Sequence, residues 1–173
     1  MTGGDLQEED SMASDRPYIL GPGEGPAYWS LGGRFVTKLG APSGEGRVTL
    51  VEALATRAAE PPVHIHHRED ESWYVLDGQL TFHVGGQVLV APTGSFVFAP
   101  RGIAHAFTVE IEPTRVLVLA APAGFERFMA EAGTEAIGDE PPPELRMLGP
   151  EILGPIGERY GIEIVGPPIR VGG

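Results

Sequence analysis

The sequence contains no cysteine, which excludes disulfide bonds, thiolate metal sites, cysteine nucleophiles and iron–sulfur clusters. Any metal ion would therefore be held by nitrogen and oxygen ligands. Basic residues are also few, since 12 Lys and Arg stand against 24 Asp and Glu and give a formal net charge of -12. A field of this sign repels phosphate backbones and anionic lipid, so neither nucleic acid nor a membrane is an expected partner.

Long hydrophobic runs are missing as well. No apolar stretch approaches the roughly 20 residues that span a bilayer, and the N-terminus lacks a basic segment followed by an apolar one. We therefore expect a cytoplasmic protein. The 173 residues are enough for one domain with a core of its own.

Glycine and proline are abundant, at 25 and 17 residues, and predict many turns between short elements. Between about residues 28 and 121, β-rich runs are separated by Gly, Pro or Asp-Gly at spacings of roughly 8–12 residues, a pattern typical of an antiparallel sandwich or barrel. No helical crossover interrupts them, which excludes a parallel dinucleotide-binding sheet. The predicted strands are 34–38, 47–56, 63–66, 72–76, 79–84, 87–90, 96–99, 104–109 and 114–120.

Two dipeptides between these runs predict tight hairpins. Asp77-Gly78 and Gly85-Gly86 are both of the type that favours the positive φ angles of two-residue connections. We therefore expect an all-β meander that turns back on itself at both places.

The chain divides into three expected parts. Residues 1–15 carry five acidic and no basic side chains and predict a disordered acidic tail. Residues 16–122 form the barrel domain. Residues 123–173 form an extension of one or two short helices and a strap that packs on the barrel.

The extension begins with an amphipathic helix over 124–132, whose apolar stripe has helical spacing and ends at Gly133. A weaker helix is expected over 151–160, because Gly154-Pro155 interrupts it, and a last strand over 162–165. The first helix could cover the barrel mouth as a lid or pack on the outer sheet face, and we expect the second arrangement.

Three histidines and one glutamate form a candidate metal site. His64 and His66 share one face of a strand, because side chains alternate with a period of two. Glu71 begins the next strand, and His105 begins a later one. Burying three imidazoles and a carboxylate together without neutralisation is costly, so we expect a metal ion rather than a metal-free polar pocket.

We predict no metal-binding role for the neighbouring polar residues. His67 and His83 fall on the opposite strand faces. Arg68, Glu69 and Asp70 are interpreted as a solvated turn, although a strand that starts one residue earlier would put Asp70 in the place of Glu71.

These segments resemble the two motifs of the cupin superfamily. The first motif, H-x-H-x4-E-x6-G, is matched by His64, His66, Glu71 and Gly78. The second, G-x5-P-x-G-x2-H, is matched by Gly94, Pro100, Gly102 and His105. The Asn that usually closes the second motif is replaced by Val109. The resemblance implies a jelly-roll β-barrel, in agreement with the turn spacing.

We expect one divalent transition-metal ion, and the ligand set does not distinguish among Fe, Ni, Mn, Co, Cu and Zn. Four protein ligands would leave two positions of an octahedral ion free. Aromatic residues near the motifs are candidates for the pocket wall and favour a flat, apolar small-molecule substrate. They are Trp73, Phe82, Phe96, Phe98 and Phe107.

Among cupins, the chain is most similar to quercetinase-like dioxygenases. That resemblance implies an enzyme acting with O2 on a flavonol or a similar aromatic molecule, with His64, His66 and His105 as ligands and Glu71 as ligand and catalytic base. The alternatives are a non-oxidative metal-dependent isomerase, cyclase or lyase, and a binding or sensing module without catalysis. An apolar strand exposed on the outside of such a barrel commonly packs against another protein surface, so we expect a homodimer.

Overall fold

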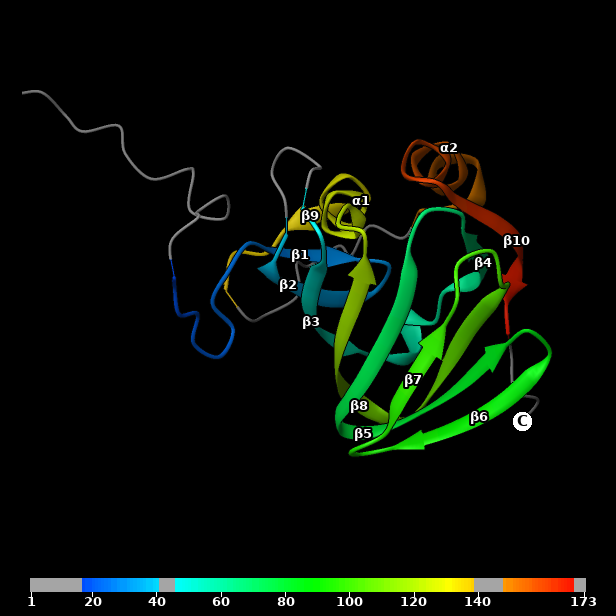
Figure 1. The fold of residues 1–173 in the computed structure, drawn as a ribbon, viewed down its shortest axis with the longest axis horizontal. Coiled ribbons are helices and arrows are strands. Elements are labelled where there is room, and N and C mark those ends of the chain that lie inside the picture. The colour runs from blue at the N-terminus through cyan, green and yellow to red at the C-terminus, as the bar shows by residue number, and fades with distance from the viewer. Residues whose placement is uncertain (1–16, 41–45, 139–147, 170–173) are drawn as a thin grey trace, which may run out of the picture.

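The computed structural model describes residues 17–40, 46–138 and 148–169. The acidic tail expected at residues 1–15 lies outside the described residues. The described chain is a β-barrel with two short helices at one end (Figure 1). The prediction of an all-β jelly roll with short C-terminal helices is therefore confirmed. Over the described ranges, neither helix has the length and apolar character needed to cross a membrane.

The strands are β1 Ala27–Ser30, β2 Gly33–Leu39, β3 Thr49–Ala55, β4 Pro62–His66, β5 Asp70–Val84, β6 Gln87–Pro92, β7 Phe96–Ala99, β8 His105–Ala121, β9 Gly133–Glu135 and β10 Ile162–Pro168. The α-helices are α1 Phe125–Glu131 and α2 Pro150–Tyr160, and a 3₁₀ turn covers Arg57–Ala59.

Strands β5 and β8 form the central pair of the sheet. They pair antiparallel along most of their length, from Asp70 opposite Ala121 to Val84 opposite His105. The other edge of β5 pairs with β7 and then with β6, while β8 pairs with β3 and, at one point, with β4. The sheet continues from β3 through β2 and β1 to β9, and β10 is added beyond β4.

The predicted hairpin at Asp77-Gly78 is wrong, because β5 runs straight through it. The pairing with β8 shifts register on both sides of Gly78, which makes an irregularity rather than a reversal. Gly78 has φ +98, and a Cβ at that position would lie 2.3 Å from Oγ1 of Thr114 on β8, so only glycine fits so close to the neighbouring strand. The runs predicted at 104–109 and 114–120 are likewise one strand, β8.

The hairpin predicted at Gly85-Gly86 does connect two strands. It joins β5 to β6 with Val84 opposite Gln87, and its glycines have φ of 56 and 81. Two successive positive φ angles are those of a type I′ turn, whose twist matches the strands it connects.

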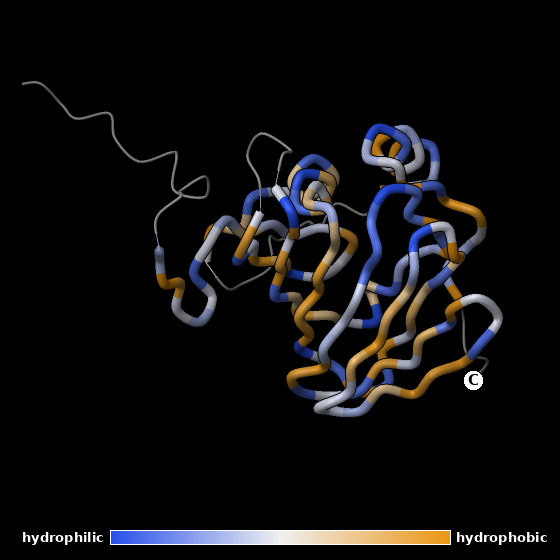
Figure 2. The backbone as a smooth tube through the Cα atoms, viewed as in Figure 1, coloured by the Kyte–Doolittle hydropathy of each residue, from blue (hydrophilic) through white to orange (hydrophobic). Residues whose placement is uncertain are grey.

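Hydrophobic residues follow the strands around the barrel (Figure 2). The side chains of Val51, Val75, Leu80, Phe82 and Val116 are fully or almost fully buried in the core of the barrel. His66 lies beneath the start of α1, with its ring centre 5.7 Å from that of Phe125.

The two helices of the C-terminal extension cover the cavity beside His64 and His66, so the expectation that the first helix packs on the outer sheet face is wrong. Phe125, Phe128 and Met129 of α1 are buried and face the barrel interior, and α1 packs against α2. The helical period identifies an apolar stripe but does not say which surface the stripe will cover.

Helix α2 is continuous although Pro155 lies inside it, and Gly161 ends it in the left-handed conformation at φ 78. The strand that follows, β10, pairs with β4 and sets Ile164 opposite His64 and Ile162 opposite His66. The end of the described chain is thereby joined to the strand that carries two of the histidines.

Candidate metal centre

Three strands bring the four predicted ligands together. One ligand atom from each of His64, His66, Glu71 and His105 lies within 4.8 Å of the other three. Strand alternation turns His64 and His66 to the same side of β4, and the pairing of β4 with β8 places His105 directly opposite His64. Glu71 enters from β5, with Oε2 lying 3.2 Å from Nε2 of His66 and 3.1 Å from Nε2 of His105.

Backbone carbonyls orient two of the imidazoles. Nδ1 of His64 lies 2.8 Å from the carbonyl oxygen of Pro62, and Nδ1 of His105 lies 2.9 Å from that of Ile103. Since a carbonyl oxygen can only accept a hydrogen bond, each ring carries a proton on Nδ1. The Nε2 atoms of both rings therefore face the centre of the cluster as potential ligands.

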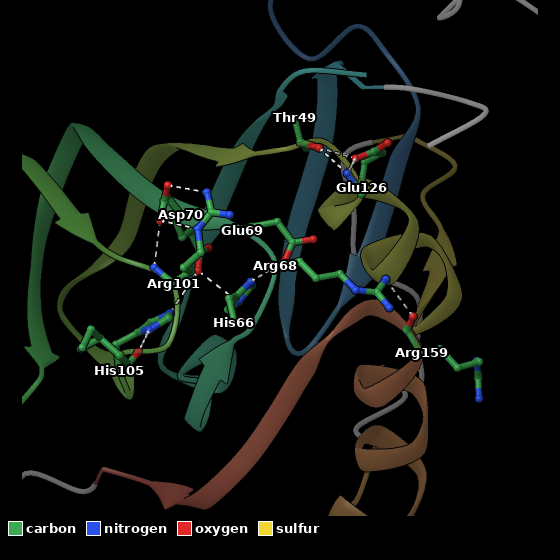
Figure 3. A network of polar contacts seen from close by, with 12 residues as sticks. Thr49, His66, Arg68, Glu69, Asp70, Arg101, His105, Glu126 and Arg159 are labelled. Atoms are coloured by element: carbon green, nitrogen blue, oxygen red, sulfur yellow. Dashed lines mark hydrogen bonds and ion pairs between the residues drawn. The ribbon is translucent and has the colours of Figure 1, made fainter. Parts of the chain in front are cut away.

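The interpretation of Glu69 as part of a solvated turn is wrong. Its side chain is only 4% exposed, and Oε2 lies 3.5 Å from Nδ1 of His66 (Figure 3). Its neighbours His67 and Arg68 are exposed, as expected for a turn. No local pattern therefore distinguishes Glu69 from the exposed residues beside it.

Asp70 does not take the place of Glu71. It accepts hydrogen bonds from the backbone N–H and the guanidinium of Arg101, at 2.8 to 3.1 Å, on the partly exposed outside of the barrel (Figure 3). These bonds to Arg101 lower the pKa of Asp70 to about 2. Alternation along β5 therefore sends Glu71 inward and Asp70 outward.

The members of the cluster shift one another's pKa values. Burial alone would raise the pKa of Glu71, but the charge of His66 and the hydrogen bond from His105 outweigh it and lower the pKa to about 2. Burial, together with the nearby imidazoles of His105 and His66, lowers the pKa of His64 to about 3. For His66 the attraction of Glu71 and Glu69 outweighs burial and raises the pKa. Glu71 is thus ionised and His64 neutral at neutral pH.

The charge balance fits a divalent cation. Glu69 and Glu71 are the buried acidic residues, and no lysine or arginine is buried among the residues that the structure describes. The two carboxylates raise the pKa of His66, so they attract positive charge, and a buried carboxylate without a counter-charge is costly in a protein interior. One divalent ion would neutralise them, and the nitrogen and oxygen donors suit a transition metal.

The cluster opens into an apolar cavity of about 70 Å³. The cavity lies between the barrel and its helical cover, and Phe128 and Met129 of α1 and Leu153 of α2 line it. Two of the predicted pocket residues, Trp73 and Phe107, also line it. A second cavity of about 370 Å³ lies against the first and shares five of its lining residues. They are Leu31, Pro61, Pro62, Leu153 and Ile164.

The other three predicted pocket residues lie elsewhere. Phe82 is fully buried behind the cavity wall, with its ring centre 4.8 Å from that of Trp73 and 5.8 Å from that of Phe107. Phe96 and Phe98 are 66% and 50% exposed on the outer face of β7. Their assignment to the pocket is wrong, because Val97 and Ala99 are the residues of β7 that point inward.

Residues 50–120 match the family described as "Cupin domain", and all four members of the cluster fall within that range. The chain therefore contains a cupin domain over these residues. Superposition of whole structures shows the same fold. An RmlC-like cupin from Shewanella frigidimarina, 21% identical, aligns over 67% of this chain and 99% of its own with a TM-score of 0.56.

Curated relatives of this cupin match over part of their length. Quercetin 2,3-dioxygenase of Bacillus subtilis is 26% identical over 119 residues, which are 68% of this chain and 35% of the dioxygenase. An uncharacterized protein of Streptomyces coelicolor is 38% identical over 56 residues, 32% of this chain and 53% of that protein. The chain thus spans about a third and a half of the lengths of these two proteins.

Two solved enzymes share the cupin fold. The polyketide cyclase RemF from Streptomyces resistomycificus is 22% identical and aligns over 61% of this chain and 80% of its own, with a TM-score of 0.52. The nucleoside dehydratase Pac13, from Streptomyces, is 15% identical and aligns over 70% and 92%, with a TM-score of 0.52. At these identities the likeness establishes the fold alone.

Proposed function

We propose that this cupin is a metal-dependent dioxygenase that acts with O2 on a flavonol or a similar small aromatic molecule. The observation that carries the proposal is the convergence of three imidazole nitrogens and one carboxylate oxygen at the wall of an apolar cavity. The partial match to a quercetin 2,3-dioxygenase supports the choice of reaction.

His64, His66 and His105 would hold the ion, because their Nε2 atoms face one another from strands β4 and β8. When bound, a divalent transition metal acidifies a hydroxyl group placed against it and, where it is redox-active, permits reaction with O2. The strands are tied to one another by backbone pairing, so the three donors are fixed in place before a ligand arrives.

Glu71 would accept the proton of the substrate hydroxyl. Its low pKa keeps the carboxylate ionised and able to accept a proton at neutral pH. The same low pKa makes it a weak base, so it suits a hydroxyl that is itself unusually acidic. An enolic or phenolic hydroxyl meets that requirement better than an aliphatic alcohol does.

The walls favour an apolar substrate with a single polar end. Apart from the cluster, the inner cavity is lined by hydrocarbon and aromatic side chains, which exclude water from the polar centre. Ligand pockets ordinarily occupy roughly 300–1,000 Å³, so the inner cavity alone is small for an aromatic molecule of several rings. The adjoining 370 Å³ cavity would accommodate the rest of such a ligand.

An oxygen electrode tests this proposal. Protein loaded in turn with Fe, Ni, Co and Mn, and supplied with 3-hydroxyflavone or quercetin, is expected to consume O2 in proportion to the flavonol lost. Loss of a substrate without O2 uptake would favour a non-oxidative lyase or isomerase, and binding without turnover would favour a sensing module. Either result, or no O2 uptake with any of the metals, would overturn the dioxygenase proposal.

A further inference from the structure

We infer that Glu69 is a positioning residue, whose carboxylate accepts a hydrogen bond from Nδ1 of His66 and holds Nε2 of that ring toward the metal. The inference rests on the proposed metal site. It assigns a role to a residue that stands at an unspecified position of the first cupin motif and is not one of the four candidate ligands.

The burial of Glu69 needs an explanation, because a carboxylate is rarely buried without a partner. Its Oε2 and both ring nitrogens of His66 are buried, and none of them makes a hydrogen bond that meets ordinary geometry. Oε2 nevertheless lies 3.5 Å from Nδ1 of His66, a separation that a small rotation of either side chain would turn into a hydrogen bond. Among the described side chains, Glu69 and His66 are thus placed to satisfy each other.

His66 differs in this respect from the other two imidazoles. Nδ1 of His64 and Nδ1 of His105 are both bonded to backbone carbonyls, which are neutral acceptors fixed by the strands. His66 has a carboxylate behind it instead. A carboxylate in that position fixes the ring orientation and increases the basicity of the opposite nitrogen, which strengthens that nitrogen as a ligand.

On the side away from His66, Glu69 lies against the residues that begin α1. It follows the end of β4 and lies beside Gly124, where a Cβ would come within 3.4 Å of Oε1 of Glu69. The next residue, Phe125, packs its ring 5.7 Å from that of His66. Glu69 therefore occupies the space between His66 and the start of α1, and this part of the helical cover limits its movement.

Glu69 is not placed to be a ligand itself. Its carboxylate lies on the Nδ1 side of the His66 ring, whereas the cluster lies on the Nε2 side, 3.2 Å from Glu71. The two nitrogens of an imidazole point away from each other, so one ion cannot be bound by Nε2 of His66 and Glu69 together. Glu71 is the carboxylate of the cluster, and Glu69 acts through His66.

Zinc affinity of Glu69→Gln and Glu69→Ala, measured by chelator competition, tests the inference. Removal of a carboxylate behind a ligating histidine typically weakens metal binding about 10–100-fold. Glu69→Gln keeps the shape of the side chain and an acceptor oxygen, so we expect it to weaken zinc binding by about 10-fold. Glu69→Ala keeps neither and should weaken zinc binding by about 100-fold. The control is Asp70→Asn, the neighbouring carboxylate on the outside of the barrel, which should bind zinc like the parent.

Nitrogen-15 NMR of histidine-labelled, zinc-loaded protein supplies a readout that a packing role would not change. The Nδ1–H of His66 should give a strongly downfield proton signal, which moves upfield in Glu69→Gln while those of His64 and His105 stay in place. Parent affinity together with an unchanged His66 signal in Glu69→Gln would overturn the inference and leave the metal site intact. A parent chain that fails to bind zinc would overturn the metal site itself.

Discussion

Replacement of Glu71 by glutamine is expected to lower kcat by about 10²–10⁴-fold, the range that general acid–base catalysis contributes. Glutamine has almost the same volume, so the side chain should still fill its place between His66 and His105. It cannot take up a proton as a carboxylate does. The loss should therefore fall on kcat measured with saturating metal and substrate, more than on substrate affinity.

Glu163→Gln is the matched control for this substitution. Glu163 lies on β10, is exposed, and pairs with the exposed His67 at 2.8 Å, an interaction of a kind that contributes little. Its replacement should leave kcat unchanged. A Glu71→Gln protein that folds, binds metal and retains kcat within a few fold of the parent would show that Glu71 is not the base.

Replacement of Phe82 by alanine is expected to reduce the free energy of unfolding by about 3–5 kcal/mol, as for other buried aromatic residues cut back to alanine. Phe82 is wholly buried and contacts the rings of Trp73 and Phe107, both of which line the inner cavity. Denaturation by urea, followed by circular dichroism, measures the change.

Phe96→Ala provides the comparison for Phe82→Ala. Phe96 is 66% exposed on the outer face of the sheet, so its loss should change the free energy of unfolding by no more than about 0.5 kcal/mol. The two phenylalanines were indistinguishable as pocket candidates in the sequence. Equal costs for the two substitutions would contradict the inward and outward assignments described above.

The candidate metal cluster could be predicted because its geometry is local. Alternation along one strand determines that His64 and His66 share a face, and motif spacing predicts the positions of Glu71 and His105. The pairing of β4 with β8 then places His105 opposite His64. The proximity of these four residues depends little on the rest of the chain, so local pattern and motif spacing are enough to predict it.

The pocket wall could not be predicted in the same way. In Phe96–Ala99 large and small residues alternate, and hydrophobicity alone favours turning the large ones inward. The inner face of β5 already carries Trp73 and Glu71, which lie opposite Val97 and Ala99. Space between the strands therefore admits the small residues, and the phenylalanines point outward. Only the strand pairing shows this.

The buried state of Glu69 has a similar cause. The residues around it are polar and resemble a solvated turn, and the segment that lies against it begins at Gly124, 55 positions later in the chain. The apolar stripe of α1 was evident from its period, but the surface it covers depends on that distant contact. Burial of this kind follows from tertiary packing rather than from any local pattern.

The metal content of His66→Ala, compared with that of the parent and of His67→Ala, tests the central claim most directly. His66 is 1% exposed within the cluster, whereas its neighbour His67 is exposed and paired with Glu163. After loading with a divalent transition metal and desalting, elemental analysis should find about one ion per chain in the parent and in His67→Ala. His66→Ala should retain almost none. Equal metal in all three proteins would contradict the assignment of His64, His66, Glu71 and His105 as a metal centre.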